Sequence, residues 1–373
     1  MIAITGSRGF IGQHLTNYLT LIQKKTIISI SRTSFNNPGE LEKLLYNCNI
    51  IIHLASVNRH ESEEYIYEEN QRITSALCDV LKNFKSLPKF INISSIHEGS
   101  KSAFGRSKLD SRKAFENLYS ENKNLFISLR VPNVFGPFCK PNYNSFIATF
   151  CHNLINNIEI KIDNDKEIDL LYVDDLVQTI VKCISSEKKE DIIFSIIPRS
   201  VSEIYNTLLD MHSRYFLNAE IPDLNNRFEL NLFNTYRSHL DYSAFFPKKR
   251  IKHKDERGYF AELLHLNSGG QISISSSKPQ VERGNHFHTR KIERFQILNG
   301  SALIQLRKVN DHDVIEVALD SKNLDFIDIP IWYTHNIINT SKKNQELLML
   351  FWISEHYNPK SHDTYFMNVR NEN

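Results

Sequence analysis

The sequence predicts an α/β domain with a parallel sheet, followed by an all-β barrel. From Met1 to about Ile184, short apolar runs alternate with helical patterns, which is typical of a parallel sheet covered by helices on both faces. After about Phe246 the segments are short, alternate apolar and polar residues, and are separated by turn residues, as in all-β barrels. The 373 residues therefore suit two domains, which we predict at 1–246 and 247–373.

Individual elements follow from the same patterns. The apolar, β-rich runs Ile50–Leu54, Phe90–Ile93 and Leu125–Leu129 are predicted to be buried strands. Lys108–Tyr119 is predicted to be a helix, because its apolar side chains fall at i, i+3 and i+4. In the second part, Ile304–Arg307 alternates as a half-buried strand does.

Composition argues against several functional classes. The formal net charge is +2, from 45 basic and 43 acidic residues, without a basic stripe, so we expect no nucleic-acid partner. No apolar run is long enough to span a bilayer, so we expect no membrane association. The five cysteines form no CxxC pair, and a nucleotide-binding pattern starts at once. We therefore expect reduced thiols, no signal peptide and a cytoplasmic location.

A glycine-rich segment follows the first β-like residues and opens a helix, with the spacing G-x-x-G-x-x-G. Glycines let the backbone turn tightly and approach a pyrophosphate, which then lies at the helix N-terminus. The alternative is an ordinary strand-to-helix turn, but the strand before it and the amphipathic helix after it favour a dinucleotide site. The residues predicted to contact the cofactor here are Gly6, Arg8, Gly9, Phe10, Ile11 and Gly12.

The second strand, Ile27–Ile30, is followed by Ser31 and Arg32. NAD-specific folds tend to place an acidic residue at this point, whereas an arginine suits the 2′-phosphate of NADP. Arg8 is a second candidate cation. We therefore predict NADP(H) as the cofactor; the alternative is that both arginines are ordinary solvated surface residues.

The strand that ends at Ser95 is followed by a segment from Phe104 to Lys108. This pattern resembles the extended short-chain dehydrogenase/reductase family, with its Rossmann fold. The resemblance implies that Ser95 binds the substrate oxygen and that Lys108 binds the nicotinamide ribose. It also places Phe104 where the family has its catalytic tyrosine.

A phenyl ring at Phe104 cannot donate a proton, and losing such an acid typically costs about 10²–10⁴-fold in rate. Three explanations are open: a module kept for binding, a proton from water or a nearby group such as His97, or an engineered variant. A second Y-x-x-x-K pattern at Tyr119 to Lys123 would lie at the far end of the helix, so we do not assign it the role.

Other segments extend the resemblance. Ile52 to Ala55 is similar to the family's adenine- and ribose-side strand, and Asn70 to an asparagine behind its active site. Arg130 to Pro137 is similar to an element near the nicotinamide and the sugar nucleotide. The cofactor contacts that the resemblance implies are Leu54, Ala55, Lys108 and Pro132.

The second part contains a strong metal-site pattern, H-x-H-x₄-E-x₆-G. His286 and His288 are two apart on a predicted strand, so both rings point to one face. With Glu293 and a later His335, they resemble the two cupin motifs. Three histidines and one carboxylate suit Zn²⁺, with Mn²⁺ and Fe²⁺ as alternatives, and a barrel without metal as the remaining reading. Trp332 replaces the usual glycine and is expected to narrow the barrel mouth.

Asp255 to Glu262 resembles the D-x-R-G-x-F-x-E opening of cupins that epimerise deoxy-keto sugar nucleotides. Proton abstraction beside a ketone needs a base and a group that stabilises the enolate. His286 or His288 is the candidate base, although a metal-bound imidazole is a poor one. Tyr333 is the candidate proton partner.

The two halves together resemble the CapF/WbjC family of capsule and O-antigen biosynthesis over nearly the whole chain, including Val57–Arg59, Gly284–His286 and Asp363–Phe366. The resemblance implies a UDP-sugar substrate in the UDP-N-acetyl-L-fucosamine pathway. The cupin would epimerise a UDP-2-acetamido-2,6-dideoxy-4-keto-hexose at carbon 3, and the first domain would reduce carbon 4 with NADPH, giving UDP-2-acetamido-2,6-dideoxy-L-talose. The implied substrate contacts are Arg59, Asn133, Lys140, Asn142 and Tyr143.

Two alternatives to this bifunctional reading are open. One is an epimerase whose first domain has lost its reductase activity, motivated by Phe104. The other is a protein that binds the nucleotide sugar without turnover, against which the metal motif and Lys108 argue. We expect a homodimer, because helices that flank Rossmann sheets often pair across a two-fold axis.

Overall fold

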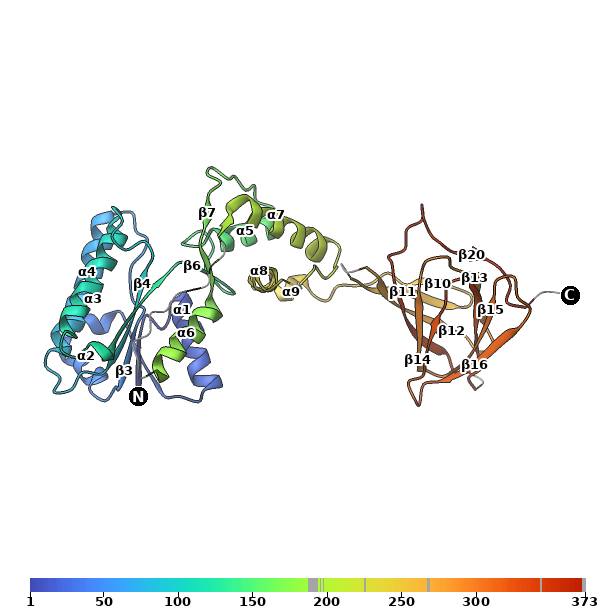
Figure 1. The fold of residues 1–373 in the computed structure, drawn as a ribbon, viewed down its shortest axis with the longest axis horizontal. Helices are drawn as coiled ribbons and strands as arrows, with labels where there is room; N and C mark the ends of the chain where they lie inside the picture. The colour runs from blue at the N-terminus through green and yellow to red at the C-terminus, as the bar shows by residue number, and fades with distance from the viewer. Residues whose placement is uncertain are drawn as a thin grey trace. The chain divides into compact units, whose positions relative to one another are not determined.

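The computed structural model describes residues 1–186, 194, 196, 198–224, 226–266, 269–342 and 344–370. Its contacts divide the chain into two units, which are described separately (Figure 1). The first unit contains Met1–Leu209 and Arg227–Leu240, and the second contains Asp210–Asn226 and Asp241–Asn373. The domain boundary after Phe246 stays a prediction.

The first unit is built on a five-stranded parallel sheet, in the order β2-β1-β3-β4-β5, as the sequence predicts. From β1 the chain moves to one side to form β2 and then crosses to the other side to form β3. In open α/β sheets, ligands bind at the carboxyl ends of the strands where the order reverses in this way. The strands are β1 (Ile2–Thr5), β2 (Ile27–Ile30), β3 (Ile50–His53), β4 (Lys89–Ser95) and β5 (Phe126–Val131).

Helices cover both faces of this sheet (Figure 1). Successive strand residues face opposite sides, so Ile51 packs in one core and Ile52 in the other. One face is covered by α1 (Phe10–Asn17) and α6 (Val173–Ser185). The other is covered by α2 (Pro38–Leu45), α3 (Glu63–Leu81) and α4 (Ala103–Leu118).

Smaller strands and helices complete the first unit. The strand β6 (Asn133–Phe135) pairs with β8 (Leu170–Tyr172), and β7 (Glu167–Ile168) pairs with β9 (Arg199–Ser200). The further helices of the first unit are α5 (Phe146–Ile155), α8 (Arg227–Arg237) and most of α7 (Val201–Met211). The short helix α9 (Tyr242–Phe245) belongs to the second unit. Among the described residues, no helix combines the length and apolarity needed to cross a membrane.

The second unit packs two antiparallel sheets face to face, which confirms the predicted all-β cupin (Figure 1). Apolar side chains between the sheets, including Ile297, Ile304 and Met349, form its core. One sheet contains β10 (His253–Asp255), β11 (Gly258–His265), β12 (Gln271–Ser277), β19 (Leu347–Ile353), β14 (Glu293–Asn299) and β17 (Phe326–Ile329). The other contains β16 (Val314–Asp320), β15 (Ser301–Lys308), β18 (Tyr333–Asn339), β13 (Glu282–Phe287) and β20 (Tyr365–Phe366).

Candidate functional sites

The glycine loop joins β1 to α1 in a conformation that side chains would block. Gly6 has φ +70°, and a Cβ there would lie 2.8 Å from the Ala55 nitrogen. A Cβ on Gly12 would lie 2.1 Å from the Gly6 carbonyl oxygen, so α1 packs directly on the loop. Gly9 is the N-cap of α1, and none of the described side chains caps it. The positive end of α1 is therefore left for an anion.

The end of β3 is tied to this loop by Thr5. Its Oγ1 accepts hydrogen bonds from the Leu54 and Ala55 nitrogens, each at 3.1 Å, and lies 2.8 Å from His53 Nδ1. Burial lowers the pKa of His53 to about 3, so its imidazole is neutral at pH 7. The sequence analysis assigned no role to His53, because a buried histidine in a strand carries no local signal.

Most of the predicted cofactor residues lie along the carboxyl edge of the parallel sheet. The sheet's parallel strands put the residues that follow β1, β2, β3 and β4 at their shared carboxyl edge. Phe10 and Ile11 open α1, Leu54 and Ala55 follow β3, and Pro132 lies buried between β5 and β6.

Asn70 joins two helices to the loop that follows β3. Its Oδ1 accepts from the Val57 nitrogen at 2.7 Å, and its Nδ2 donates to the Val57 oxygen at 2.8 Å. Nδ2 also lies 3.0 Å from Ser107 Oγ on α4. Asn70 is buried, so these bonds satisfy an amide that would otherwise be costly to bury.

At the predicted reductase site, Lys108 lies near Phe104, which stands where the family has a tyrosine hydroxyl. Lys108 Nζ donates to the Ile93 carbonyl at 2.9 Å and lies 5.6 Å from the centre of the Phe104 ring. Burial lowers the pKa of Lys108 to about 8. Ser95 is buried at the end of β4, and its Oγ accepts from the His97 nitrogen at 3.1 Å. The Phe104 ring offers neither an acid nor a base there.

Tyr119 lies at the other end of α4. Its hydroxyl is buried and donates to the Pro88 carbonyl at 2.9 Å, just before β4 begins. Because Ser95 ends the same strand, Tyr119 is at the amino edge of the sheet and Ser95 is at the carboxyl edge.

Arg32 follows β2 and is held by an acidic side chain that the sequence analysis did not identify. It forms an ion pair with Glu69 at 3.0 Å, and Arg72 forms a second ion pair with the same carboxylate at 2.7 Å. The Arg32 side chain is 61% exposed. Two guanidinium groups on one carboxylate leave an excess of one positive charge, which suits a phosphate. Arg8 is exposed on the glycine loop.

Three of the predicted substrate residues meet on the surface of the first unit. Arg59 donates to the Tyr143 carbonyl oxygen, and Lys140 Nζ lies 5.8 Å from the centre of the Tyr143 ring. Asn142, with φ +54°, is held through its backbone nitrogen by a hydroxyl on α5 at 2.9 Å. Asn133 lies on β6, where its backbone nitrogen donates to a carbonyl at 3.2 Å. Arg59, Asn142 and Tyr143 are exposed, as a surface that binds a nucleotide sugar requires.

The second unit brings all four predicted metal ligands together. His286 lies on β13, His288 follows it, Glu293 begins β14 and His335 lies on β18. One possible ligand atom from each lies within 4.8 Å of the others. Glu293 Oε2 is 3.1 Å from His288 Nε2 and 3.2 Å from His335 Nε2. We refer to these four residues as the metal cluster.

Three polar atoms that face one another in the metal cluster have no hydrogen-bond partner among the described residues. Within the described part of the chain, His288 Nε2, His335 Nε2 and Glu293 Oε2 are buried and have no hydrogen-bond partner. Burial opposes ionisation of Glu293, but the two imidazoles hold its pKa below the usual range. Burial lowers the pKa of His286 to about 4, so it is a neutral imidazole at pH 7. A buried carboxylate surrounded by three imidazoles fits a divalent cation, which would satisfy all these atoms.

Two aromatic residues lie beside the metal cluster in the sequence. Tyr333 is two residues before His335 on β18, so both side chains face the interior, where Tyr333 packs on the core. Trp332 has φ +61°, a left-handed conformation that explains why glycine is usual here. Its ring stacks on Phe287 with centres 5.7 Å apart and is 49% exposed. A narrowed barrel mouth stays a prediction.

Comparisons with known proteins match a family model to each of the two predicted domains. Residues 2–196 match the NAD dependent epimerase/dehydratase family, and residues 253–365 match the polysaccharide biosynthesis C-terminal domain. The UDP-2-acetamido-2,6-beta-L-arabino-hexul-4-ose reductase of Pseudomonas aeruginosa is 30% identical over 99% of this chain and 98% of its own length. The spore coat polysaccharide biosynthesis protein SpsL of Bacillus subtilis is 27% identical over 31% of this chain and 82% of its own length.

Solved structures extend the similarity to the fold. The capsular polysaccharide assembling protein CapF of Staphylococcus aureus aligns with a TM-score of 0.87 and 34% identity, covering 98% of this chain and 99% of that one. The UDP-glucose 4-epimerase of Thermotoga maritima aligns with 64% of this chain and 97% of that one, at 17% identity and a TM-score of 0.54, which shows a shared fold alone. The chain therefore belongs to the NAD dependent epimerase/dehydratase family through its first unit and, over nearly its whole length, to the CapF family.

Proposed function

We propose that this protein modifies a UDP-sugar at two separate centres during capsule or O-antigen synthesis. The cupin epimerises a UDP-2-acetamido-2,6-dideoxy-4-keto-hexose at carbon 3. The first domain then reduces the ketone at carbon 4 with NADPH, giving UDP-2-acetamido-2,6-dideoxy-L-talose. The Pseudomonas aeruginosa relative is a UDP-2-acetamido-2,6-beta-L-arabino-hexul-4-ose reductase, which supports this substrate class.

The metal cluster is the observation that carries the epimerase assignment. Its four residues would hold a divalent ion, with zinc the first candidate for this set of nitrogens and one carboxylate. When bound, the ion would supply electrostatic stabilisation for the enolate that forms when the proton beside the ketone is removed. The assignment depends on the chemistry of the donors, three imidazoles and one carboxylate.

Protein groups around the metal cluster would handle the proton. His288 Nδ1 already bonds to the Asp363 carbonyl, and its Nε2 faces Glu293, so His286 is the better candidate base. It would accept the proton in a state in which the other three residues hold the ion, because a metal-bound imidazole has no free lone pair for a proton. His286 is also the only half-buried member of the metal cluster, which leaves it open to substrate. Tyr333, on the same face of β18 as His335, is the candidate donor on the opposite side of the sugar.

In the first unit, the glycine loop would hold the pyrophosphate of NADPH and Arg32 its 2′-phosphate. Lys108 would orient the nicotinamide ribose, and Ser95 would bind the ketone oxygen. Arg59, Lys140, Asn142, Tyr143 and Asn133 would bind the nucleotide sugar. With Phe104 in the tyrosine position, we propose that the Lys108 ammonium, 5.6 Å from the centre of the Phe104 ring, supplies the proton through a water molecule.

Phe104 also favours a second candidate function, in which the first unit binds nucleotide and only the cupin turns over. A direct hydroxyl donor is worth about 10²–10⁴-fold in rate, so its loss could leave reduction too slow to matter. A homodimer would be compatible with either function.

Mass spectrometry of the UDP-4-keto-6-deoxy sugar after incubation with pure protein in D₂O distinguishes these functions. Deuterium gain without a cofactor is expected from the epimerase. A further gain of two hydrogens when NADPH is added would establish the reductase. Deuterium gain without any reduction would support the epimerase alone, and no change of mass under either condition would refute both.

A further inference from the structure

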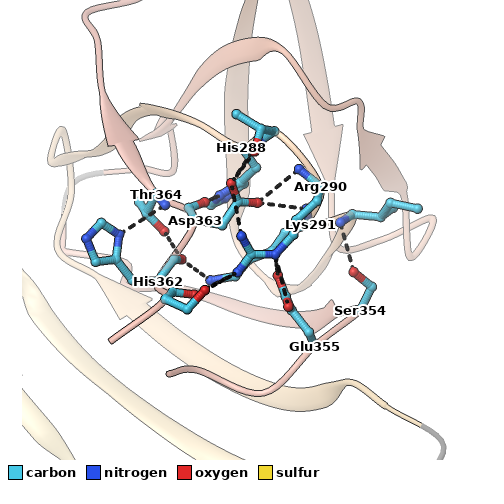
Figure 2. Close-up of polar contacts among 11 residues, drawn as sticks. His288, Arg290, Lys291, Ser354, Glu355, His362, Asp363 and Thr364 are labelled. Atoms are coloured by element: carbon cyan, nitrogen blue, oxygen red, sulfur yellow. Dashed lines mark hydrogen bonds and ion pairs between the residues drawn. The ribbon is translucent and has the colours of Figure 1, made fainter. Parts of the chain in front are cut away.

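Asp363 is a buried carboxylate that contacts the loop between two metal ligands, although it is far from them in the sequence. Its side chain is 0% exposed. Oδ1 accepts from the Thr289 nitrogen at 3.1 Å and the Thr289 hydroxyl at 2.6 Å. Oδ2 accepts from the Arg290 and Lys291 nitrogens, each at 3.0 Å (Figure 2). The carboxylate thus binds three successive backbone N–H groups and one hydroxyl.

This loop sets the spacing of the metal cluster. His288 immediately precedes Thr289, and Glu293 follows Lys291 by two residues. A rotation of the loop would therefore move the His288 imidazole and the Glu293 carboxylate relative to each other. The four hydrogen bonds to the Asp363 carboxylate all come from the loop between His288 and Glu293. The carboxylate therefore fixes the separation of these two metal ligands.

The backbone of Asp363 acts on His288 directly. Its carbonyl oxygen lies 2.5 Å from His288 Nδ1 (Figure 2). A carbonyl only accepts, so Nδ1 carries the hydrogen, and the lone pair of Nε2 is directed toward Glu293. Partners of this kind fix the tautomer and the orientation of metal-binding imidazoles.

The segment that carries Asp363 is itself fastened to the barrel. Arg290 Nη2 donates to the Ser361 carbonyl at 2.7 Å, and Lys291 Nζ donates to the His362 carbonyl. Farther along, the Met367 nitrogen donates to the Asn285 carbonyl at 2.9 Å, beside His286. The segment 361–367 is thus held on both sides of Asp363, before it by the loop and after it by β13.

We propose that Asp363 is a positioning residue of the metal centre, which fixes the loop between His288 and Glu293 and the orientation of His288. This inference rests on the metal site proposed above. Asparagine cannot replace Asp363, because either orientation of its amide points an NH₂ group at two donors of the loop.

The test compares Asp363→Asn with the matched variant Asp320→Asn. Asp320 also caps a turn of the barrel, accepting from the Lys322 nitrogen and the Ser301 hydroxyl, each at 2.7 Å, but it contacts no metal ligand. Zn²⁺ affinity of the metal-free proteins is measured by competition with a chromophoric chelator, and the visible absorption of the Co²⁺-loaded proteins is recorded. Circular dichroism checks folding.

Loss of an outer-shell partner typically weakens metal binding about 10–100-fold, so we expect that loss, with altered Co²⁺ bands, in Asp363→Asn but not in Asp320→Asn. If Asp363→Asn does not fold, Thr289→Val removes one bond to Oδ1 and should show a smaller loss of affinity. Wild-type affinity and Co²⁺ bands in whichever variant folds would overturn the positioning role. Failure of the wild-type protein to bind either metal would instead refute the metal site.

Discussion

The two centres of this protein differ in how complete they are. In the first unit, the glycine loop, Ser95 and Lys108 are all present, but the tyrosine position holds Phe104. In the second unit, all four members of the metal cluster converge, and a buried carboxylate holds the loop between two of them. The same chain thus combines a complete ligand set with a reductase site that lacks one hydroxyl.

The missing tyrosine hydroxyl affects proton transfer in the first unit and not the binding of its cofactor. In the function proposed above, cofactor binding in the first unit would depend on the glycine loop, Arg32 and Lys108, none of which requires the tyrosine hydroxyl. Fast, direct proton transfer does require an acid at that position, and a route from Lys108 through water would be slower. We therefore expect the first unit to bind NADPH well while reducing slowly, and the second unit to depend entirely on its metal.

Removing the metal should have the largest effect. Several kcal/mol of enolate stabilisation would be lost, so exchange of the carbon-3 hydrogen with D₂O should fall by about 10³-fold or more. Glu293→Gln should act in the same way, whereas Glu316→Gln, at an exposed ion pair on β16, should not. NADPH binding should be unchanged in both variants. Full exchange by metal-free protein would mean that the cupin works without an ion.

Restoring the hydroxyl should have the next largest effect. Phe104→Tyr is expected to raise the rate of NADPH-dependent reduction by about 10²–10⁴-fold, since it returns a positioned acid beside Lys108. Phe104→Leu, which changes the ring without adding an acid, is the matched control. Stopped-flow measurement of NADPH oxidation follows both. An unchanged rate in Phe104→Tyr would show that the hydroxyl is not what limits this site.

Arg32 should determine cofactor preference more modestly, because its side chain is largely exposed and its charge is screened. Arg32→Ala is expected to weaken NADPH binding about tenfold and to leave NADH binding almost unchanged. Lys82→Ala, an exposed cation that follows the end of α3, serves as the control. Calorimetric titration with both cofactors provides the affinities. Tighter binding of NADH than of NADPH by the wild-type protein would contradict the NADP assignment.

The smallest expected effect is a pH dependence of cofactor binding. Burial lowers the pKa of Lys108 from 10.5 to about 8, so the ammonium is present below that pH and is lost above it. Affinity for NADPH should therefore fall as the pH rises through 8, by about fourfold between pH 7 and pH 8.5 for a group of this pKa. Lys108→Met should bind more weakly and without this slope. A wild-type affinity that is flat up to pH 10 would exclude Lys108 as the titrating contact.

Much of the fold and of the metal cluster could be predicted because the signals are local. Alternating textures predict a parallel sheet and then a barrel, and both are observed. His286, His288 and Glu293 lie within eight residues, and strand alternation alone places the two histidines on one face.

The contacts that hold the sites could not be predicted, because they join distant segments. Glu69 meets Arg32 across 37 positions, and Asp363 meets Thr289 across 74. Glu69 belongs to no motif, and the stretch Asp363–Phe366 resembles the family without indicating a role for Asp363, so only the folded chain identifies these contacts. Trp332 could be predicted in part. The motif shows that glycine is usual at its position, but only the structure shows the positive φ that accounts for the glycine.

A time course by mass spectrometry of the keto sugar in D₂O with wild-type protein and NADPH tests the contrast between the centres most directly. The account predicts that deuterium enters first, so that a deuterated but unreduced sugar accumulates before the reduced product forms slowly. Reduction as fast as deuterium entry, or a reduced product without deuterium, would contradict it.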